Sequence, residues 1–351
     1  MGSKNTSKPI GVVGAGSFGT AMANILSEKS EKILLYARTQ EKAQQIEKNR
    51  QAAGQELSGN IEVTNDLSRI GDECDIIFPM VPSANFRSMM IDLSPHLRPY
   101  HIMIHGTKGF DYNVSKDFEP TEENPLTREH VQTMSEVIRS ESSVVRVGCL
   151  AGPNLAREIA EHKPAATVVA SEFDEVIAVG QKLLKTDRFL IYGSNDLVGI
   201  ELCGILKNII AVGAGMISGL ELGENAKALF ISRGLVEMVH LGKVLGGNAQ
   251  AFLGLAGVGD LMATCNSSLS RNYTVGYRLA KNQKIDEIIE SMEEVAEGIK
   301  TIDIVHELAN TFKIRVPITE TLFRILHNDM SVEDAQTYLM KFPFRVEIDF
   351  M

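Results

Sequence analysis

Short apolar runs alternate with amphipathic segments over the first half of the chain. The runs at residues 10–13, 32–37, 75–81 and 101–105 contain few polar side chains. Parallel strands have this composition because helices cover both faces of their sheet. Between the first two runs, apolar residues recur at helical spacing from Ala21 onward. This alternation predicts a mostly parallel sheet with helices on both faces.

The pattern changes near residue 195. Further apolar runs predict strands at residues 144–150, 165–170 and 189–192, with an amphipathic helix at 174–185. Beyond them the spacing is helical, and long apolar segments fill residues 197–211 and 226–245. We therefore predict an α/β fold in which a Rossmann-type domain (1–194) precedes an all-α domain (195–351).

The first apolar run leads directly into Gly14-x-Gly16-x-x-Gly19, and a helical pattern follows. In a dinucleotide-binding βαβ unit the first glycine permits the tight turn, the second lets the backbone approach a pyrophosphate, and the third lets helix and strand pack closely. The diphosphate would lie at the helix N-terminus, where the helix dipole favours an anion.

Arg38 follows the second predicted strand, at about the place where NAD-selective units carry an acidic residue. An arginine there is suited to a 2′-phosphate, which favours NADP over NAD, although a surface arginine is the alternative interpretation. Thr39 is expected to cap a polar helix over residues 40–53.

The bulk composition excludes several functional classes. The chain has 351 residues, of which 44% are hydrophobic, and a formal net charge of −10, which argues against general nucleic-acid binding. Its four cysteines are far apart and no metal-ligand spacing appears, so we expect reduced thiols and no metal. We expect neither a signal peptide nor stable membrane insertion. Gly2 fits a loose N-myristoylation pattern, but a polar leader is favoured.

Several polar side chains stand in apolar or glycine-rich surroundings. Lys207 is the sole cation of an apolar helix, and either reaches solvent or lines a cleft where burial would lower its pKa. Lys108 follows a strand, either as a solvated loop residue or as a substrate contact. Asp260 lies in a glycine-rich turn at residues 254–261. Ser270 is expected to cap a helix that places Arg271 and Asn272 in its first turn, an arrangement suited to an anion.

The motifs taken together resemble NAD(P)-dependent glycerol-3-phosphate dehydrogenase of the soluble bacterial type. In order they are GAGSFGTAMA (14–23), VPS (81–83), TKG (107–109), AGPN (151–154), LKNIIAVGAG (206–215), the block at 218–238, GVGDLMATCNSSLSRNYTVG (257–276) and AEG (296–298). They extend over nearly the whole chain.

The resemblance implies reversible reduction of dihydroxyacetone phosphate by NADPH or NADH, in the cytoplasm, by a homodimer, for phospholipid synthesis. Lys207 and Lys108 would be catalytic. The implied substrate contacts are Lys108, Gly152, Asn154, Lys207, Asp260, Ser270, Arg271 and Asn272. The implied cofactor contacts are Gly14, Gly16, Ser17, Phe18, Gly19, Arg38, Pro82, Lys108, Ala156, Arg271, Val295 and Glu297.

Two features depart from the family pattern. Asn154 stands where the family usually has a serine, which puts that contact in doubt, and the polar segment at residues 111–130 is longer than usual and is expected to run over the surface. Two alternatives stay open: another reductase of similar domain build, of the 3-hydroxyacid or ketopantoate type, and a non-catalytic nucleotide-sensing protein.

Overall fold

The structure, a computed structural model, describes residues 8–112, 114, 118, 121, 123–292, 296–327 and 329–341. It divides into two compact units. The first comprises the chain up to Thr107 together with Thr133–Leu197, and the second comprises Lys108–Gln132 together with the chain from Val198 onward. The predicted division at residue 194 differs from this one mainly in the segment 108–132, which groups with the helical unit.

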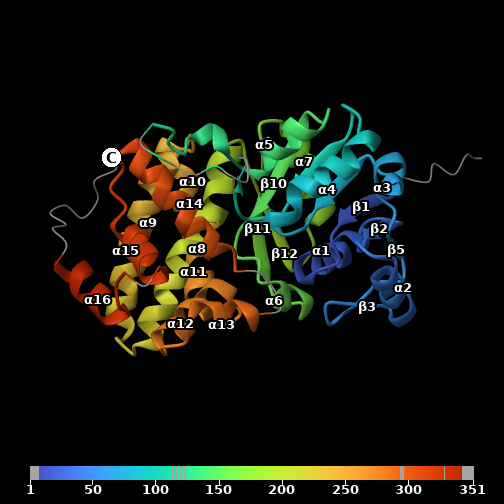
Figure 1. Cartoon of the computed structure of the whole chain (residues 1–351). Coiled ribbons are helices and arrows are strands. Elements are labelled where there is room, and N and C mark those ends of the chain that lie inside the picture. The colour runs from blue at the N-terminus through green and yellow to red at the C-terminus, as the bar shows by residue number, and fades with distance from the viewer. Residues whose placement is uncertain are drawn as a thin grey trace, which may run out of the picture. The chain divides into compact units, whose positions relative to one another are not determined.

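The first unit contains a sheet of eight strands in the order β12-β11-β10-β7-β6-β1-β2-β5 (Figure 1). All neighbouring pairs are parallel except β10 and β11. The strands are β1 (Ile10–Val13), β2 (Ile33–Tyr36), β5 (Ile61–Thr64), β6 (Ile76–Pro79), β7 (Ile102–His105), β10 (Arg146–Ala151), β11 (Ala165–Ser171) and β12 (Phe189–Ser194). The predicted Rossmann-type sheet is confirmed, while β5 adds an edge strand that the sequence analysis missed.

Successive strand residues point to opposite faces of this sheet and enter two separate cores. Val12 packs on one face with α1 (Ser17–Ser27), α2 (Gln40–Asn49), α6 (Ala156–Ala160) and α7 (Asp174–Leu184). Val13 packs on the other face with α3 (Leu67–Glu73), α4 (Phe86–Leu93) and α5 (Met134–Glu141). Helices on both faces explain why the strands are apolar throughout.

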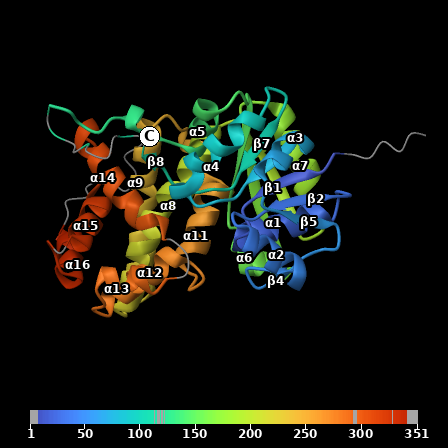
Figure 2. The ribbon, with the colours of Figure 1, turned by 45° about the vertical axis from the view of Figure 1, so that its right-hand side comes forward.

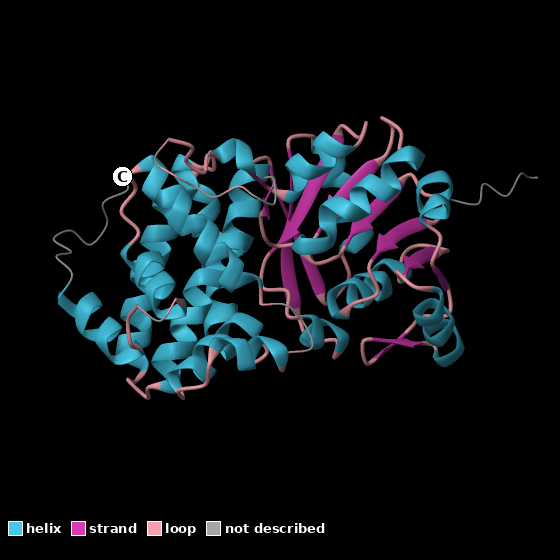
Figure 3. Cartoon of the chain, in the orientation of Figure 1, coloured by secondary structure: helices cyan, strands magenta, loops and turns pink. Residues whose placement is uncertain are grey.

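The second unit is built almost entirely of helices (Figure 3). They are α8 (Leu197–Gly219), α9 (Glu224–Val244), α10 (Ala249–Leu253), α11 (Asp260–Cys265), α12 (Arg271–Ala280), α13 (Ile285–Glu290), α14 (Glu297–Phe312), α15 (Pro317–Leu326) and α16 (Val332–Lys341). The helical domain is confirmed, with one short addition. The strands β8 (Asp111–Tyr112) and β9 (Val131–Gln132) pair with each other.

Helix α8 is the apolar centre of this unit, and glycines on it let two other helices approach closely. A Cβ at Gly213 would overlap the Phe230 ring of α9, and one at Gly215 would overlap the Tyr273 carbonyl of α12. Figures 1 and 2 show α8 beside α9 and α12. Among the described residues only α8 is long and apolar enough to cross a membrane, but 94% of its most apolar window is buried in the protein, as in a core helix.

Three local predictions need correction. Helix α2 ends at Asn49 because Arg50 adopts a left-handed conformation and β3 (Gln51–Ala52) follows. The predicted turn at 254–261 is a π-helical segment, η4 (Leu255–Gly259), that leads into α11. In the segment 111–130, which was expected on the surface, Leu126 is buried; residues 113, 115–117, 119, 120 and 122 lie outside the described part.

A buried carboxylate holds the start of α15. No side chain of α15 caps its N-terminus, but Glu237 of α9 accepts hydrogen bonds from the Ile318 and Thr319 amides at 2.8 and 2.9 Å. The Thr319 hydroxyl also donates to it, at 2.6 Å. Burial raises the pKa of Glu237 to about 7, although these donors favour its ionised form.

Glu237→Ala is expected to lower the free energy of unfolding by about 3 kcal/mol, because it leaves buried donors without an acceptor. Denaturant titration measures this change, and an unaltered midpoint would contradict the capping role. The carboxyl of Glu237 stabilises the fold fully below its ordinary pKa of 4.5 and loses this contribution as the pH rises through 7. Glu237→Gln, which cannot ionise, should weaken that pH dependence and destabilise less.

Candidate active site

The glycine turn after β1 fits a dinucleotide. Gly14 has a φ of +123°, and a Cβ there would lie 2.6 Å from the Met80 carbonyl oxygen. A Cβ at Gly19 would overlap the Gly14 carbonyl, whereas at Gly16 no described residue other than its chain neighbours comes within 4 Å of the Cβ position. The first turn of α1 has no side-chain cap and no acidic residue. These observations match a tight turn, a close helix contact and an open approach for a pyrophosphate.

Other predicted cofactor residues lie near the carboxyl ends of the central strands. Phe18 and Met80 pack so closely around Gly106, just after β7, that a Cβ there would lie 2.6 Å from either side chain. Pro82 follows β6, and the neighbouring Val81 carbonyl accepts a hydrogen bond from Thr107 at 2.6 Å. Ligands of open α/β sheets bind at this edge.

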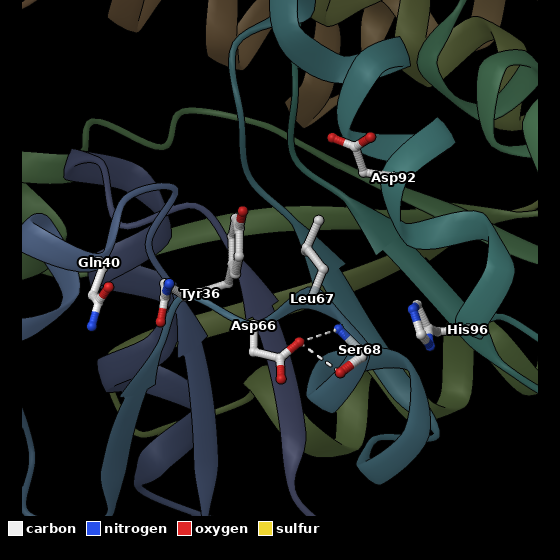
Figure 4. A pocket seen from close by; sticks show the side chains of 8 residues that line it. Tyr36, Gln40, Asp66, Leu67, Ser68, Asp92 and His96 are labelled. Carbon is white, nitrogen blue, oxygen red and sulfur yellow. Dashed lines mark hydrogen bonds between the residues drawn. The ribbon is translucent and has the colours of Figure 1, made fainter.

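A hollow of about 580 Å³ opens at the ends of β2 and β5. Figure 4 shows its lining residues, which are Tyr36, Gln40, Asn65, Asp66, Leu67, Ser68, Asp92 and His96. Hydrogen bonds from Ser68 hold the pKa of Asp66 below its usual value. A phosphate would meet like charge from Asp66 and Asp92, so the hollow itself is unsuited to one. Arg38, exposed just beyond β2, does not line it.

Beyond β10, Gly152 has a φ of +152° and Ala156 begins α6. Asn154 Nδ2 donates to the Thr167 hydroxyl at 2.8 Å, and that hydroxyl donates to the Ala151 carbonyl at 3.1 Å. Asn154 Oδ1 is buried and has no partner among the described residues. At this predicted substrate contact, where the family usually has a serine, the group left without a partner among the described residues is therefore an acceptor.

In the helical unit, α8, α11 and the segment after Thr107 bring three charged side chains together. Asp260 Oδ2 accepts from Lys108 Nζ at 2.7 Å, and Asp260 Oδ1 accepts from Lys207 Nζ. The Lys207 and Asp260 side chains are only 6% and 2% exposed, so this is a buried ion pair. The Lys108 stem lies against α8 at Gly204, where a Cβ would meet it at 3.5 Å, an ordinary van der Waals distance.

The electrostatic surroundings bring the pKa of Lys207 into the neutral range. Burial lowers its pKa to about 7, because the attraction of Asp260 offsets only part of the desolvation and Lys108 adds repulsion. Burial alone would raise the pKa of Asp260, but the two lysines hold it below its usual value. Lys207 is therefore able both to give and to take a proton near pH 7, beside an aspartate that stays ionised.

Thr264, which the sequence does not single out, also contacts this charged cluster. Its hydroxyl accepts from Lys207 Nζ at 2.6 Å and donates to the Asp260 carbonyl at 2.6 Å. The available signal was its position four residues after Asp260, which places both on one helix face. The Thr264 hydroxyl thus gives Lys207 Nζ a second hydrogen-bond acceptor beside Asp260.

At the start of α12 the predicted cap is confirmed, since the Ser270 hydroxyl accepts from the Tyr273 amide at 3.3 Å. Arg271 is exposed and Asn272 is buried in the first turn. Asn272 Oδ1 accepts from the Gly298 amide at 2.8 Å. Glu297 begins α14, while Val295, a predicted cofactor contact, lies outside the described residues.

Comparison with known proteins identifies the family. Models of the N-terminus and the C-terminus of NAD-dependent glycerol-3-phosphate dehydrogenase match residues 9–177 and 196–337. The chain belongs to the NAD-dependent glycerol-3-phosphate dehydrogenase family. It is an oxidoreductase that uses NAD or NADP.

The similarity extends along the whole chain. A Pseudomonas syringae protein named glycerol-3-phosphate dehydrogenase (NAD(P)+) is 37% identical over 99% of this chain and 98% of its own length. Its Teredinibacter turnerae namesake is 35% identical over 97% and 96%. The crystal structure of glycerol-3-phosphate dehydrogenase from Coxiella burnetii superposes with a TM-score of 0.84 at 31% identity, covering 95% of this chain and 99% of that one.

The fold is shared more widely than the family. A ketopantoate reductase from Ralstonia eutropha aligns over 94% of this chain and 99% of its own, with a TM-score of 0.54 at 14% identity. This likeness shows a common fold alone. The family match favours the dehydrogenase over the ketopantoate alternative.

Asp260→Asn is expected to reduce turnover at pH 7 by about 100-fold or more, because the carboxylate that keeps Lys207 protonated is lost. Without that charge the pKa of Lys207 falls further, so the decline of the reduction rate with rising pH should begin at lower pH. Met262→Ala, an exposed position on α11, is the matched control. Wild-type rates in Asp260→Asn would contradict this role.

Proposed function

We propose that this enzyme reversibly reduces dihydroxyacetone phosphate to sn-glycerol 3-phosphate and supplies glycerophospholipid synthesis. The observation that carries the proposal is the cluster of the buried Lys207 and Asp260 with the half-buried Lys108, in a chain of this family. NAD(P)H, when bound, supplies the hydride. The steps assigned below are those of the chain's own residues.

Lys207 is the proposed proton donor in reduction and the acceptor in oxidation. As hydride reaches C2 of the substrate, negative charge develops on the carbonyl oxygen. The positive charges of Lys207 and Lys108 stabilise it, and a proton from Lys207 Nζ completes the hydroxyl. Asp260 and Thr264 hold Lys207 through the hydrogen bonds described above. No metal takes part in this scheme.

The start of α12 is the proposed phosphate site. Arg271 offers a guanidinium that can bind a phosphate through two hydrogen bonds, and the N-terminus of a ten-residue helix favours an anion. Asn272 adds a buried amide, and Ser270 fixes the helix start. Gly152 and Asn154 are proposed as further substrate contacts. Binding the phosphate in this way orients the reacting carbonyl.

The cofactor is proposed to lie on the glycine turn of β1 and α1, whose geometry fits a pyrophosphate. Its other proposed contacts are Ser17, Phe18, Pro82, Ala156, Lys108, Arg271, Val295 and Glu297. Arg38 is assigned to the 2′-phosphate of NADPH. A cytoplasmic location and a homodimer are further proposals, the latter checked by light scattering of the purified chain.

Lys207→Ala should nearly abolish NADPH and NADH oxidation with dihydroxyacetone phosphate, followed at 340 nm, while NADPH still binds with wild-type affinity. In the wild type, reduction should slow as the pH rises through about 7 and glycerol 3-phosphate oxidation should accelerate, because Lys207 must be protonated in one direction and neutral in the other. Lys207→Arg keeps the charge without a titratable proton and should also be inactive. Near-normal kcat in Lys207→Ala would refute the assignment.

Arg38→Ala should weaken NADPH binding by about 10- to 100-fold and leave NADH binding nearly unchanged, because only NADPH carries the phosphate that the guanidinium binds. Fluorescence titration with each nucleotide measures both dissociation constants. Lys42→Ala, an exposed cation on α2, is the matched control. An unchanged ratio of the two constants would remove Arg38 from the site.

A further inference from the structure

Three buried residues from three helices meet beside the proposed phosphate site. Asn208 lies on α8, directly after Lys207; Asn272 lies in the first turn of α12; and Gly298 lies in the first turn of α14. The two asparagines are 5% and 8% exposed, and Gly298 is buried. Segments far apart in the sequence thus converge at Gly298, which lies close to both asparagines.

The chemistry of the hydrogen bond fixes which way this amide faces. The Gly298 backbone N–H is a donor only, so the Asn272 atom 2.8 Å from it must be the acceptor Oδ1. The Nδ2 group therefore points away from Gly298. It has no hydrogen-bond partner among the described residues, and it offers N–H donors, the groups that a phosphate oxygen accepts from.

Position 298 holds a glycine because a side chain there would not fit. A Cβ there would lie 2.7 Å from Asn272 Oδ1, 3.1 Å from Asn272 Cγ and 2.8 Å from the Asn208 carbonyl oxygen. Its backbone is helical, so the left-handed conformation is not the reason for a glycine. Glycine in a helix costs stability relative to alanine, and close approach is what it provides here.

We propose that Gly298 is a positioning residue for the substrate phosphate: its amide holds Asn272 so that Nδ2 faces the phosphate, and its missing side chain lets α14 reach that amide. This inference rests on the proposed function, since it assigns the phosphate to the start of α12. A methyl group at residue 298 would displace the Asn272 amide and weaken one hydrogen bond to an anion.

Gly298→Ala should raise KM for dihydroxyacetone phosphate and the dissociation constant of inorganic phosphate by about 10- to 100-fold, the range for one hydrogen bond to a charged group. The kcat should change less than KM. Gly234→Ala is the matched control, because the atoms nearest its Cβ belong to Ile210, the closest at 2.7 Å, and not to Asn208, Asn272 or Gly298. This control should lower the melting temperature and leave KM and phosphate binding unchanged.

A double-mutant cycle separates positioning from general damage to the fold. In an Asn272→Ala background, Gly298→Ala should raise KM no further, because the amide that it positions is gone. Should Gly298→Ala fail to fold, Asn272→Asp tests the same point: it keeps the shape, removes the donor and sets a negative charge against the phosphate. An unchanged KM in Gly298→Ala or Asn272→Asp, or full additivity in the cycle, would overturn the inference.

Phosphate binding is measured by titration calorimetry and needs no turnover, so the two hypotheses fail separately. Wild-type protein that binds inorganic phosphate but does not oxidise NADPH or NADH with dihydroxyacetone phosphate would contradict the proposed function. Loss of phosphate binding in Gly298→Ala alone would then still support the positioning role. Turnover with equal phosphate affinity in wild type and Gly298→Ala would contradict the positioning role alone.

Discussion

The helical unit depends on the buried ion pair between Lys207 and Asp260. Neither charge is tolerable alone at this depth, so α11 has to present its carboxylate to α8, and Lys108 makes a second ion pair with that carboxylate. With Lys207 protonated, the three groups carry one net positive charge. When the proton leaves, the three groups become neutral. In the proposed reaction, proton transfer from Lys207 to the developing alkoxide would therefore leave no unbalanced charge among these three groups.

Close helix packing is the second constraint, and glycine makes it possible. Gly213 and Gly215 bring α9 and α12 against α8, since a Cβ at either position would overlap Phe230 or Tyr273. A larger residue at either position would push one of these helices away. The apolar, glycine-containing sequence of α8 thus serves both the core and the site.

Features encoded by adjacent residues could be predicted from the sequence. The glycine turn, the strand pattern and the Ser270 cap depend on a few consecutive positions, and each is confirmed. Glu237 was missed because its partners lie 81 and 82 residues away in the chain. Thr264 was missed because its spacing from Asp260 does not reveal its contact with Lys207, which is 57 residues away. Edge strand β5 was missed because only half of its residues are buried, which shortens the apolar signal. Tertiary partners, unlike caps and turns, leave no local pattern.

The two asparagines show why residue identity alone does not define a site. Asn154 donates to Thr167, whose own proton goes to the Ala151 carbonyl, so the group it leaves unpartnered is an acceptor oxygen. Asn272 accepts from the Gly298 amide, so the group it leaves without a partner among the described residues is a donor. In each case a single partner atom decides whether the asparagine side chain has a donor or an acceptor left for a ligand. Only a donor suits a phosphate, whereas a hydroxyl can satisfy the acceptor. The functional meaning of an amide is therefore set by its neighbours, which the sequence places far from it.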